Sequence, residues 1–327
     1  MKIFYATPNS QKLPPGHRFP MGKYELLRTR LTQELTGCEL CLARPVTRGE
    51  LSLAHDVNYI ESVFEGTLSP FEQREIGFPW SVGMVDRARG SLGATLMACR
   101  VAMKEGISAN LAGGTHHAYA DRGGGFCVFN DTAVSVRVLQ LEHQRSSFEA
   151  DSGFFGSCKP LQIAVVDLDV HQGNGTAHIF KEDPSVFTLS LHGANNFPFK
   201  KEQSDLDVEL QDGCPDEIYL EALQRALMTL DSKFKPDLII YLAGADPYEG
   251  DRLGRLNLSF EGLRERDHII FEWACVRAVP VAFSMAGGYS VPIADTVNIN
   301  MNTFRTAYDY WLKYKEMRPD SPLSMAK

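Results

Sequence analysis

Short apolar segments alternate along this chain with longer segments of helical periodicity. The apolar segments are rich in β-branched residues and cover residues 2–7, 107–112, 161–168, 186–191, 238–243 and 280–286. Segments in which apolar residues recur every three or four positions lie between them, at 82–105, 131–143, 216–232 and 260–277. This alternation is typical of buried parallel strands joined by helices. It predicts an α/β fold with a mostly parallel central sheet and helices on both faces.

No internal repeat or low-complexity linker divides the sequence, so we expect a single domain over residues 1–327. The one irregular insert is expected at 144–160, between a helix and a strand. The sequence contains 33 basic and 41 acidic residues, which gives a net charge of −8, and it has no run of basic residues. This charge balance argues against nucleic-acid binding.

No apolar stretch is long enough to span a membrane, and the first residues soon reach Pro8, Asn9 and Ser10. We therefore expect a cytoplasmic protein. The seven cysteines are scattered, as in a reduced protein. Cys38 and Cys41 form a C-x-x-C pair, but no second pair or histidine cluster accompanies it, so we expect no metal site there.

Polar and glycine-rich loops follow four of the predicted strands. These loops contain residues 113–117, 167–175, 244–246 and 287–289. In open parallel sheets, ligands bind beyond the carboxyl ends of the strands, where such loops lead into the next helix. The sequence therefore predicts an active site at the C-terminal ends of the strands.

Asp169 and His171 lie two positions apart, so on an extended segment their side chains point to the same face. Asp246 from another strand end adds a second carboxylate, and three such ligands leave positions open for water and a substrate. The alternative is that each aspartate only caps the following helix. Asp167 and Asp169 make this harder to accept, because two neighbouring carboxylates at a buried strand end need a cation or protons.

His116 and His117 follow a pair of glycines and are candidates for general acid–base catalysis. Tyr289 follows Gly287 and Gly288, from where its hydroxyl can donate a hydrogen bond to an oxyanion. Cys127 is expected to be a small buried packing residue. Asp131 is expected to cap or hydrogen-bond the start of the helix that begins there.

Taken together, the motifs resemble those of the zinc-dependent histone deacetylase family, within the arginase/deacetylase superfamily. The resemblance covers nearly the whole chain and rests on six ordered motifs, at 17–20 (His-Arg-Phe-Pro), 113–118, 123–131, 167–175, 244–246 and 287–289. The first motif and the Asp-Val-His-Gln-Gly-Asn-Gly sequence at 169–175 are most similar to class IV and to bacterial histone deacetylase-like amidohydrolases.

This resemblance implies roles for individual residues. Zinc would be held by Asp169, His171 and Asp246. His117 would be the general base and then the general acid, His116 a hydrogen-bonding neighbour oriented by Asp167, and Tyr289 the oxyanion donor. The channel for the acyl-lysine stem would be lined by Gly125, Phe126 and Phe197.

Asn174 stands where class I relatives place an aspartate behind the catalytic base. An amide accepts the imidazole N–H but supplies no negative charge, so we expect His117 to be less basic than in aspartate-paired relatives.

The resemblance also implies two potassium sites. The first would use Asp167, Asp169, His171, Ser190 and Leu191, and the second would use backbone oxygens near Phe180, Asp183 and Val186.

The expected reaction is hydrolysis of an Nε-acyl-lysine, or of a related acylated amine, with an acetyl or longer acyl group. An acetylpolyamine amidohydrolase is the main alternative and needs acidic residues at the channel mouth, for which the candidates are Glu72, Glu75, Asp86, Asp121 and Glu249. A manganese ureohydrolase is disfavoured because no acid follows His171 at the spacing that bridges a second metal. A non-catalytic acyl-ligand-binding protein is also disfavoured, because every expected catalytic position is filled.

Overall fold

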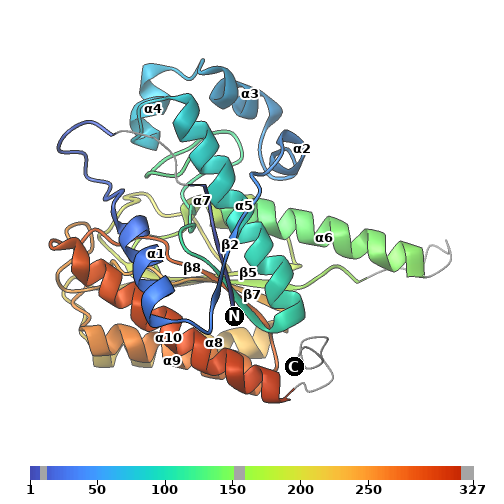
Figure 1. Cartoon of the computed structure of the whole chain (residues 1–327), viewed down its shortest axis with the longest axis vertical. Helices are drawn as coiled ribbons and strands as arrows, with labels where there is room; N and C mark the ends of the chain where they lie inside the picture. Colours follow the sequence, from blue (N-terminus) through green and yellow to red (C-terminus); the bar gives the residue numbers. More distant parts are fainter. Residues whose placement is uncertain (8–12, 151–158, 318–327) are drawn as a thin grey trace.

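An eight-stranded sheet lies at the centre of the part of the chain that the computed structural model describes, residues 1–7, 13–150 and 159–317 (Figure 1). Its strands are β1 (Lys2–Tyr5), β2 (Glu39–Leu42), β3 (Ile107–Asn110), β4 (Ile163–Asp167), β5 (Val186–Gly193), β6 (Leu206–Leu210), β7 (Leu238–Leu242) and β8 (Val281–Ser284). Their order is β2-β1-β3-β8-β7-β4-β5-β6, and every neighbouring pair is parallel. The predicted α/β fold with a parallel sheet is confirmed.

The six predicted strands correspond to β1, β3, β4, β5, β7 and β8. Strands β2 and β6 were not predicted. They are the two edge strands, and most of their residues are only half-buried or exposed. An edge strand of this kind lacks the continuous apolar run by which a central parallel strand is recognised.

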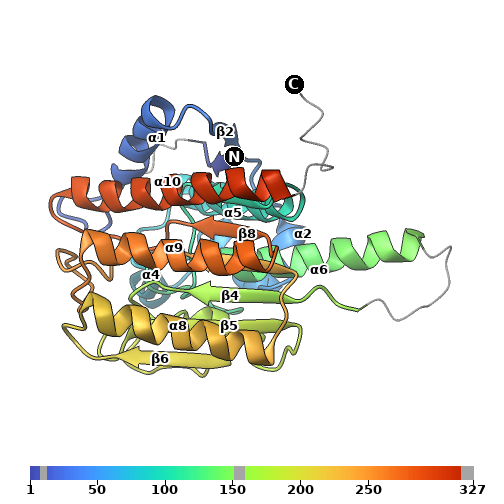
Figure 2. The same cartoon turned by 90° about the horizontal axis from the view of Figure 1, so that it is seen from below.

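Ten helices accompany the sheet in the described residues. They are α1 (Lys23–Glu34), α2 (Arg48–Leu51), α3 (Val57–Glu65), α4 (Pro70–Ile76), α5 (Val82–Glu105), α6 (Asp131–Ala150), α7 (Asn174–Phe180), α8 (Asp216–Lys233), α9 (Phe260–Val276) and α10 (Ile293–Met317). Helices α1, α8, α9 and α10 cover one face, and α5 and α6 cover the other (Figure 2).

Successive residues of the central strands point into two different cores. In β4, Ala164 and Val166 belong to the large core shared with α8, α9 and α10. Ile163 and Val165 belong to the core shared with α5 and α6. Both faces of the sheet are therefore buried, which accounts for the unbroken apolar character of these strands.

The helices expected at 82–105, 216–232 and 260–277 are confirmed as α5, α8 and α9. Helices α1 to α4, α7 and α10 were not predicted. Two of them had a readable signal, since α2 and α4 begin at capping boxes formed by Thr47 with Glu50 and by Ser69 with Glu72.

Helix α6 begins at Asp131 but continues to Ala150, so the first part of the expected insert at 144–160 is helical. This stretch contains neither Gly nor Pro and so does not interrupt the helix. Residues 151–158 lie outside the described residues. Helix α6 projects from the body at the end opposite to the strand arrowheads (Figure 2), so residues 144–150 do not cover the carboxyl ends of the strands.

A third apolar cluster lies under α3 and α4 and includes Phe19, Phe78, Phe129 and Tyr289. It joins the N-terminal segment to the loop that follows β8. None of the helices in the described part of the chain is both long and apolar enough to cross a bilayer.

Candidate active site and metal centre

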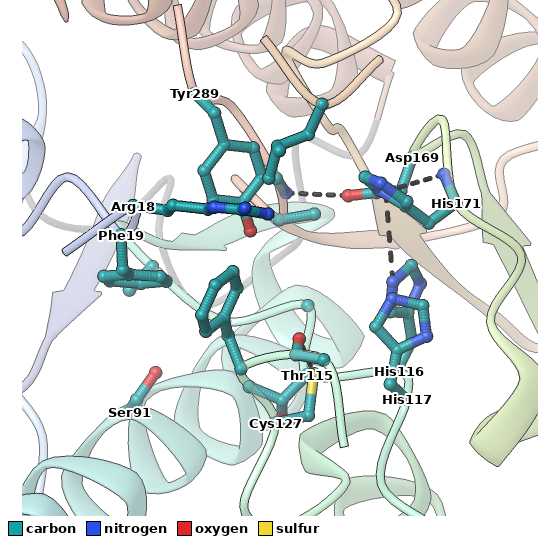
Figure 3. A pocket seen from close by; sticks show the side chains of 18 of the residues that line it. Arg18, Phe19, Ser91, Thr115, His116, His117, Cys127, Asp169, His171 and Tyr289 are labelled. Carbon is teal, nitrogen blue, oxygen red and sulfur yellow. Dashed lines mark hydrogen bonds and ion pairs between the residues drawn. The ribbon is translucent and has the colours of Figure 1, made fainter. Parts of the chain in front are cut away.

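A cavity of about 940 Å³ opens at the carboxyl ends of β1, β3, β4 and β8 (Figure 3). Most of the predicted site residues line it: His116, His117, Gly125, Phe126, Asp169, His171, Phe197 and Tyr289. Asp167, Asn174 and Asp246 do not line the cavity but contact residues that do. The prediction that the loops after separate strands converge at this end of the sheet is confirmed.

Asp169, His171 and Asp246 come together as predicted, with one ligand atom from each within 4.8 Å of the others. His171 Nδ1 lies 2.9 Å from Asp169 Oδ1 and 3.3 Å from Asp246 Oδ2. All three residues are buried, and neither carboxylate is more than 2% exposed. The two aspartates follow β4 and β7, which are neighbours in the sheet.

Three observations show that this cluster fits a zinc ion. Ligand atoms about 2.0–2.1 Å from a tetrahedral zinc lie about 3.3 Å apart, close to the separations found here. Asp246 Oδ2 is buried and accepts no hydrogen bond from any described residue. Burial, together with the nearby charge of Asp169, raises the pKa of Asp246 to about 7, so a cation is needed to keep both carboxylates ionised.

Backbone amides orient the two carboxylates. Val170 N donates to Asp246 Oδ1 at 3.0 Å, and Gly287 N donates to Asp169 Oδ2 at 2.7 Å. A Cβ at Gly287 would lie only 1.9 Å from Asp246 Oδ2. Glycine is therefore required here by the close approach of the backbone to the ligand oxygen.

His116 and His117 lie beside this cluster, with ring centroids 4.1 Å apart (Figure 3). His116 Nδ1 is 2.6 Å from Asp167 Oδ2. Burial alone would lower the pKa of His116, but the charges of Asp167 and Asp169 outweigh it and raise the pKa to about 9. His116 is therefore the more basic of the two.

His117 Nδ1 lies 2.7 Å from Asn174 Oδ1, at the first residue of α7. The Asn174 amide in turn donates to Tyr119 Oη at 3.1 Å. Burial and the positive charges of His116 and His171 lower the pKa of His117 well below its usual value. The lowering comes from burial and from the two histidines, whereas the hydrogen bond to Asn174 favours the protonated form, so the comparison with aspartate-paired relatives stays a prediction.

Asp131 holds the loop that carries the two histidines. Its carboxylate accepts hydrogen bonds from Gly114 N at 2.9 Å and from Thr115 N at 2.8 Å. Asp131 Oδ1 also accepts from Thr132 N at 3.0 Å, so the expected hydrogen bond to the start of α6 is present. Asn130 Oδ1 accepts from Ala133 N in the same turn. The side chain of Asp131 thus joins the start of α6 to the loop after β3, and the contact with that loop is long-range and has no signal in the sequence.

Tyr289 lies across the cavity from His116 and His117 (Figure 3). Its backbone N–H donates to Asp251 Oδ2 at 2.6 Å, and its carbonyl accepts from Arg252 Nε at 2.9 Å. Burial and the charges of Asp169 and Asp246 raise the pKa of Tyr289 well above its usual value, so its hydroxyl stays protonated as a donor. Asp251 and Arg252 were not predicted, because a charged loop usually indicates only a solvated surface.

Gly125 lies between His117 and Phe197. A Cβ at Gly125 would be 2.5 Å from His117 Cδ2 and 3.1 Å from Phe197 Cε1, and its φ of +50° favours glycine. The rings of His117 and Phe197 are 4.9 Å apart, and Phe126 packs against Phe19 at 5.5 Å. These residues form an aromatic wall along the cavity, with Phe197 37% exposed at its outer end.

Other predicted residues lie at or beyond the edge of this site. Cys127 is buried and lines the cavity, and burial raises the pKa of its thiol, consistent with a packing role. Cys38 and Cys41 are free thiols outside the metal cluster. Of the five acidic residues considered for the channel mouth, Glu75 lines the cavity and the other four do not.

The residues of the first expected potassium site lie at the end of β4, in the loop that follows it and in β5, and those of the second lie between the last residue of α7 and the first residue of β5. Asp167 is paired with Ser190 in the sheet, followed in β5 by Leu191. The Phe180 carbonyl oxygen accepts a hydrogen bond from Asp183 N, and the Asp183 carbonyl oxygen accepts one from Val186 N.

Comparison with known proteins gives consistent matches. The sequence profile of the histone deacetylase domain matches residues 17–302. An uncharacterised protein of Picosynechococcus is 40% identical over 309 residues, covering 94% of this chain and 97% of that protein. Histone deacetylase 2 of Arabidopsis thaliana is 33% identical over 204 residues, covering 62% of this chain but only 49% of its own length. The crystal structure of an HDAC homologue from Aquifex aeolicus superimposes with a TM-score of 0.71 at 23% identity, covering 95% of this chain and 89% of that one, and has the same fold.

Proposed function

Because this chain belongs to the histone deacetylase family, we propose that it hydrolyses Nε-acyl-lysine or a related acylated amine to the free amine and a carboxylate. The observation that carries the proposal is the buried cluster of Asp169, His171 and Asp246 beside His117 and Tyr289. We take residues 1–327 as one catalytic domain, since loops from both halves of the sheet contribute to the site.

Asp169, His171 and Asp246 would hold the zinc ion. Bound zinc supplies a Lewis acid that polarises the acyl carbonyl and acidifies the attacking water. His117 donates its Nδ1–H to Asn174, which leaves the lone pair on Nε2. Its low pKa keeps this nitrogen neutral, so it accepts the proton of the water and later returns it to the leaving amine.

Tyr289 stabilises the negative charge that develops on the acyl oxygen by donating its phenolic hydrogen. Its backbone is fixed at both N–H and C=O, so the hydroxyl is oriented before the substrate arrives. His116 is held by Asp167 and keeps a positive charge beside His117. That charge further disfavours a protonated His117 before the reaction begins.

Gly125, Phe126 and Phe197 guide the methylene stem of the acylated amine toward the zinc site. Acyl groups longer than acetyl are accepted in this proposal, because the cavity continues past the site to Tyr5, Arg28 and Ser91. Assignment to class IV is supported by the His-Arg-Phe-Pro motif, in which Phe19 packs against the rings of both Phe126 and Tyr289.

An acetylpolyamine substrate is less well supported. A second ammonium needs carboxylates at the mouth, whereas the cavity is lined by Glu25 and Glu75 against a larger set of arginines: Arg18, Arg28, Arg74, Arg87, Arg252 and Arg255. A two-metal ureohydrolase is disfavoured because the described residues contain a single cluster of metal-binding groups.

Potassium sites at Asp167, Asp169, His171, Ser190 and Leu191, and at Phe180, Asp183 and Val186, remain part of the proposal. The first is supported by the pairing of Asp167 with Ser190 on adjacent strands. The second is supported by the carbonyl oxygens of Phe180 and Asp183, which keep a free lone pair after accepting one hydrogen bond each.

The test is a matched substrate panel: an acetyl-lysine peptide, a long-chain acyl-lysine peptide and an acetylated polyamine, each incubated with zinc-loaded protein. We expect turnover of at least one acyl-lysine peptide, abolished in Asp246→Asn. Preference for the polyamine would overturn the lysine assignment. Absence of turnover with every member, at one bound zinc per chain, would contradict the proposed activity.

A further inference from the structure

Asn174 can present either of two groups to His117. Its side chain ends in an oxygen that accepts hydrogen bonds and an amino group that donates them. Contact through the oxygen requires a proton on His117 Nδ1 and leaves the lone pair on Nε2, whereas contact through the amino group exchanges the roles of the two nitrogens. In a protease triad, an asparagine that imposes the wrong tautomer on the catalytic histidine lowers kcat by about 10,000-fold. The orientation of this amide therefore matters for a general base.

Tyr119 contacts the other half of the same amide. Asn174 Oδ1 lies 2.7 Å from His117 Nδ1, and Asn174 Nδ2 lies 3.1 Å from Tyr119 Oη. Both Asn174 and Tyr119 are buried, at 6% and 8% exposed. A phenol has a single hydrogen, so Tyr119 Oη donates to the amide or accepts from it according to where that hydrogen lies.

Glu202 takes the hydrogen of Tyr119. Its Oε1 is 3.1 Å from Tyr119 Oη, and an ionised carboxylate only accepts hydrogen bonds. Burial and the charge of Glu202 raise the pKa of Tyr119, so the phenol keeps its hydrogen. Because this hydrogen points to Glu202, Tyr119 Oη accepts from Asn174 Nδ2. The oxygen of Asn174 is then the group that faces His117.

The two residues at the outer end of this chain are held in place by further contacts. The Glu202 N–H donates to Gln172 Oε1 at 2.9 Å, and the Glu202 carbonyl accepts from Gln172 Nε2 at 2.7 Å. Gln172 directly follows His171 of the metal cluster. The Arg122 guanidinium lies 3.8 Å from the centroid of the Tyr119 ring. Glu202 is thus fixed relative to the metal cluster through its main chain, although its side chain is 30% exposed.

We propose that Tyr119 and Glu202 are positioning residues for the reaction, which fix the orientation of the Asn174 amide and thereby keep the proton of neutral His117 on Nδ1. Each group in the chain donates to the next, and the chain ends at a carboxylate. This inference rests on the proposed function, in which His117 Nε2 takes the proton of the water. An aspartate behind the base needs no such chain, because both of its oxygens accept.

A double-mutant cycle in kcat separates positioning from a structural role. Glu202→Met removes the acceptor at similar length, and we expect kcat to fall about tenfold with little change in KM, the effect of losing one hydrogen-bond preference. In a Tyr119→Phe background the same change is expected to lower kcat less than about twofold, because the hydroxyl that Glu202 orients is absent. Glu202→Gln keeps an acceptor oxygen and is expected to stay within about twofold of the unmodified protein. Equal losses from Glu202→Met in both backgrounds, or no loss in either, would overturn the proposal.

Nitrogen-15 NMR of the His117 ring supplies a readout that needs no turnover, so failure of the proposed activity does not leave this chain untested. Protonated and unprotonated nitrogens of a neutral imidazole have distinct resonances, and the loss of signals in His117→Ala assigns them. In the zinc-loaded protein we expect the proton on Nδ1. In Glu202→Met we expect a shift of the proton toward Nε2, and in Glu202→Gln a return to Nδ1.

Asp207→Asn is the matched control for this measurement. Asp207 Oδ1 also accepts from Gln172 Nε2, at 2.9 Å, but within the described part of the chain it accepts no hydrogen bond from Tyr119. The His117 resonances are expected to stay in place in this variant. A proton on Nε2 in the unmodified protein, unchanged resonances in Glu202→Met, or the same shift in Asp207→Asn would refute the positioning role.

Discussion

Replacing Asn174 by aspartate tests how the pKa of His117 is set. The amide oxygen of Asn174 is 2.7 Å from His117 Nδ1, so Asn174→Asp places a negative charge against the imidazole with almost no change in shape. A carboxylate favours the imidazolium form, whereas the amide does so only weakly. The substitution is therefore expected to raise the pKa of His117.

The size of the effect follows from the geometry. Two unit charges about 4 Å apart interact by about 4 kcal/mol at an effective dielectric constant near 20, equivalent to about three pKa units. Burial of the new carboxylate opposes part of this gain, since Asn174 is only 6% exposed. We expect the pKa of His117 to rise by about one to three units.

The assay is the pH dependence of kcat/KM for an acyl-lysine peptide. Because a general base must be neutral, the rate falls as the pH drops through its pKa, so a raised pKa moves this acidic limb to higher pH. Tyr119→Phe is the control, since it removes the other partner of Asn174 without adding charge. An acidic limb that stays in place in Asn174→Asp would refute the assignment of His117 as the base.

Three further predictions concern the metal and the stability of the fold. Gly287→Ala brings a Cβ to 1.9 Å from Asp246 Oδ2 and is expected to weaken zinc binding about 10- to 100-fold, measured by chelator competition; unchanged affinity would contradict the site geometry. Removing zinc is expected to lower the free energy of unfolding by about 4 kcal/mol where free zinc is 1,000 times its Kd, and equal urea curves with and without metal would contradict this. Arg44 and Thr47 hold the pKa of Glu50 down at about 2, below its usual 4.5. The contribution of ionised Glu50 to the free energy of unfolding is therefore complete above pH 4.5 and is lost as the pH falls toward 2. Glu50→Gln should abolish this acid-dependent loss, which we expect to be about 1 kcal/mol because solvent screens the half-exposed Arg44. Urea unfolding between pH 6 and 2 measures the loss, and parallel pH profiles of the free energy of unfolding in the two proteins would contradict the prediction.

The residues that converge on the zinc site were readable from the sequence because each follows a recognisable buried strand. Asp169, His171 and Asp246 could be placed at one edge of the sheet once the strands were known to be parallel. The wall formed by Gly125, Phe126 and Phe197 came only from the family resemblance, since no periodicity brings residues 125 and 197 together.

The supporting residues could not be predicted in the same way. Lys23, Asp131 and Asp251 are charged side chains whose neighbours in sequence indicate a helix start or a solvated loop. Their contacts are to backbone groups far along the chain, such as Lys23 with Ala286. Contacts of this kind depend on the packed tertiary structure and leave no local pattern. The edge strands β2 and β6 were not predicted, because their residues are only partly buried and so do not form a continuous apolar run.

The most direct test of the proposed function compares the zinc-loaded protein with His117→Ala on an acyl-lysine peptide, at equal bound zinc. We predict that the unmodified protein releases one amine and one carboxylate per peptide, while His117→Ala keeps its zinc but loses turnover by at least about 100-fold. Equal turnover by the two proteins, or none by either, would contradict the account of this site as a zinc-dependent deacylase with His117 as its base.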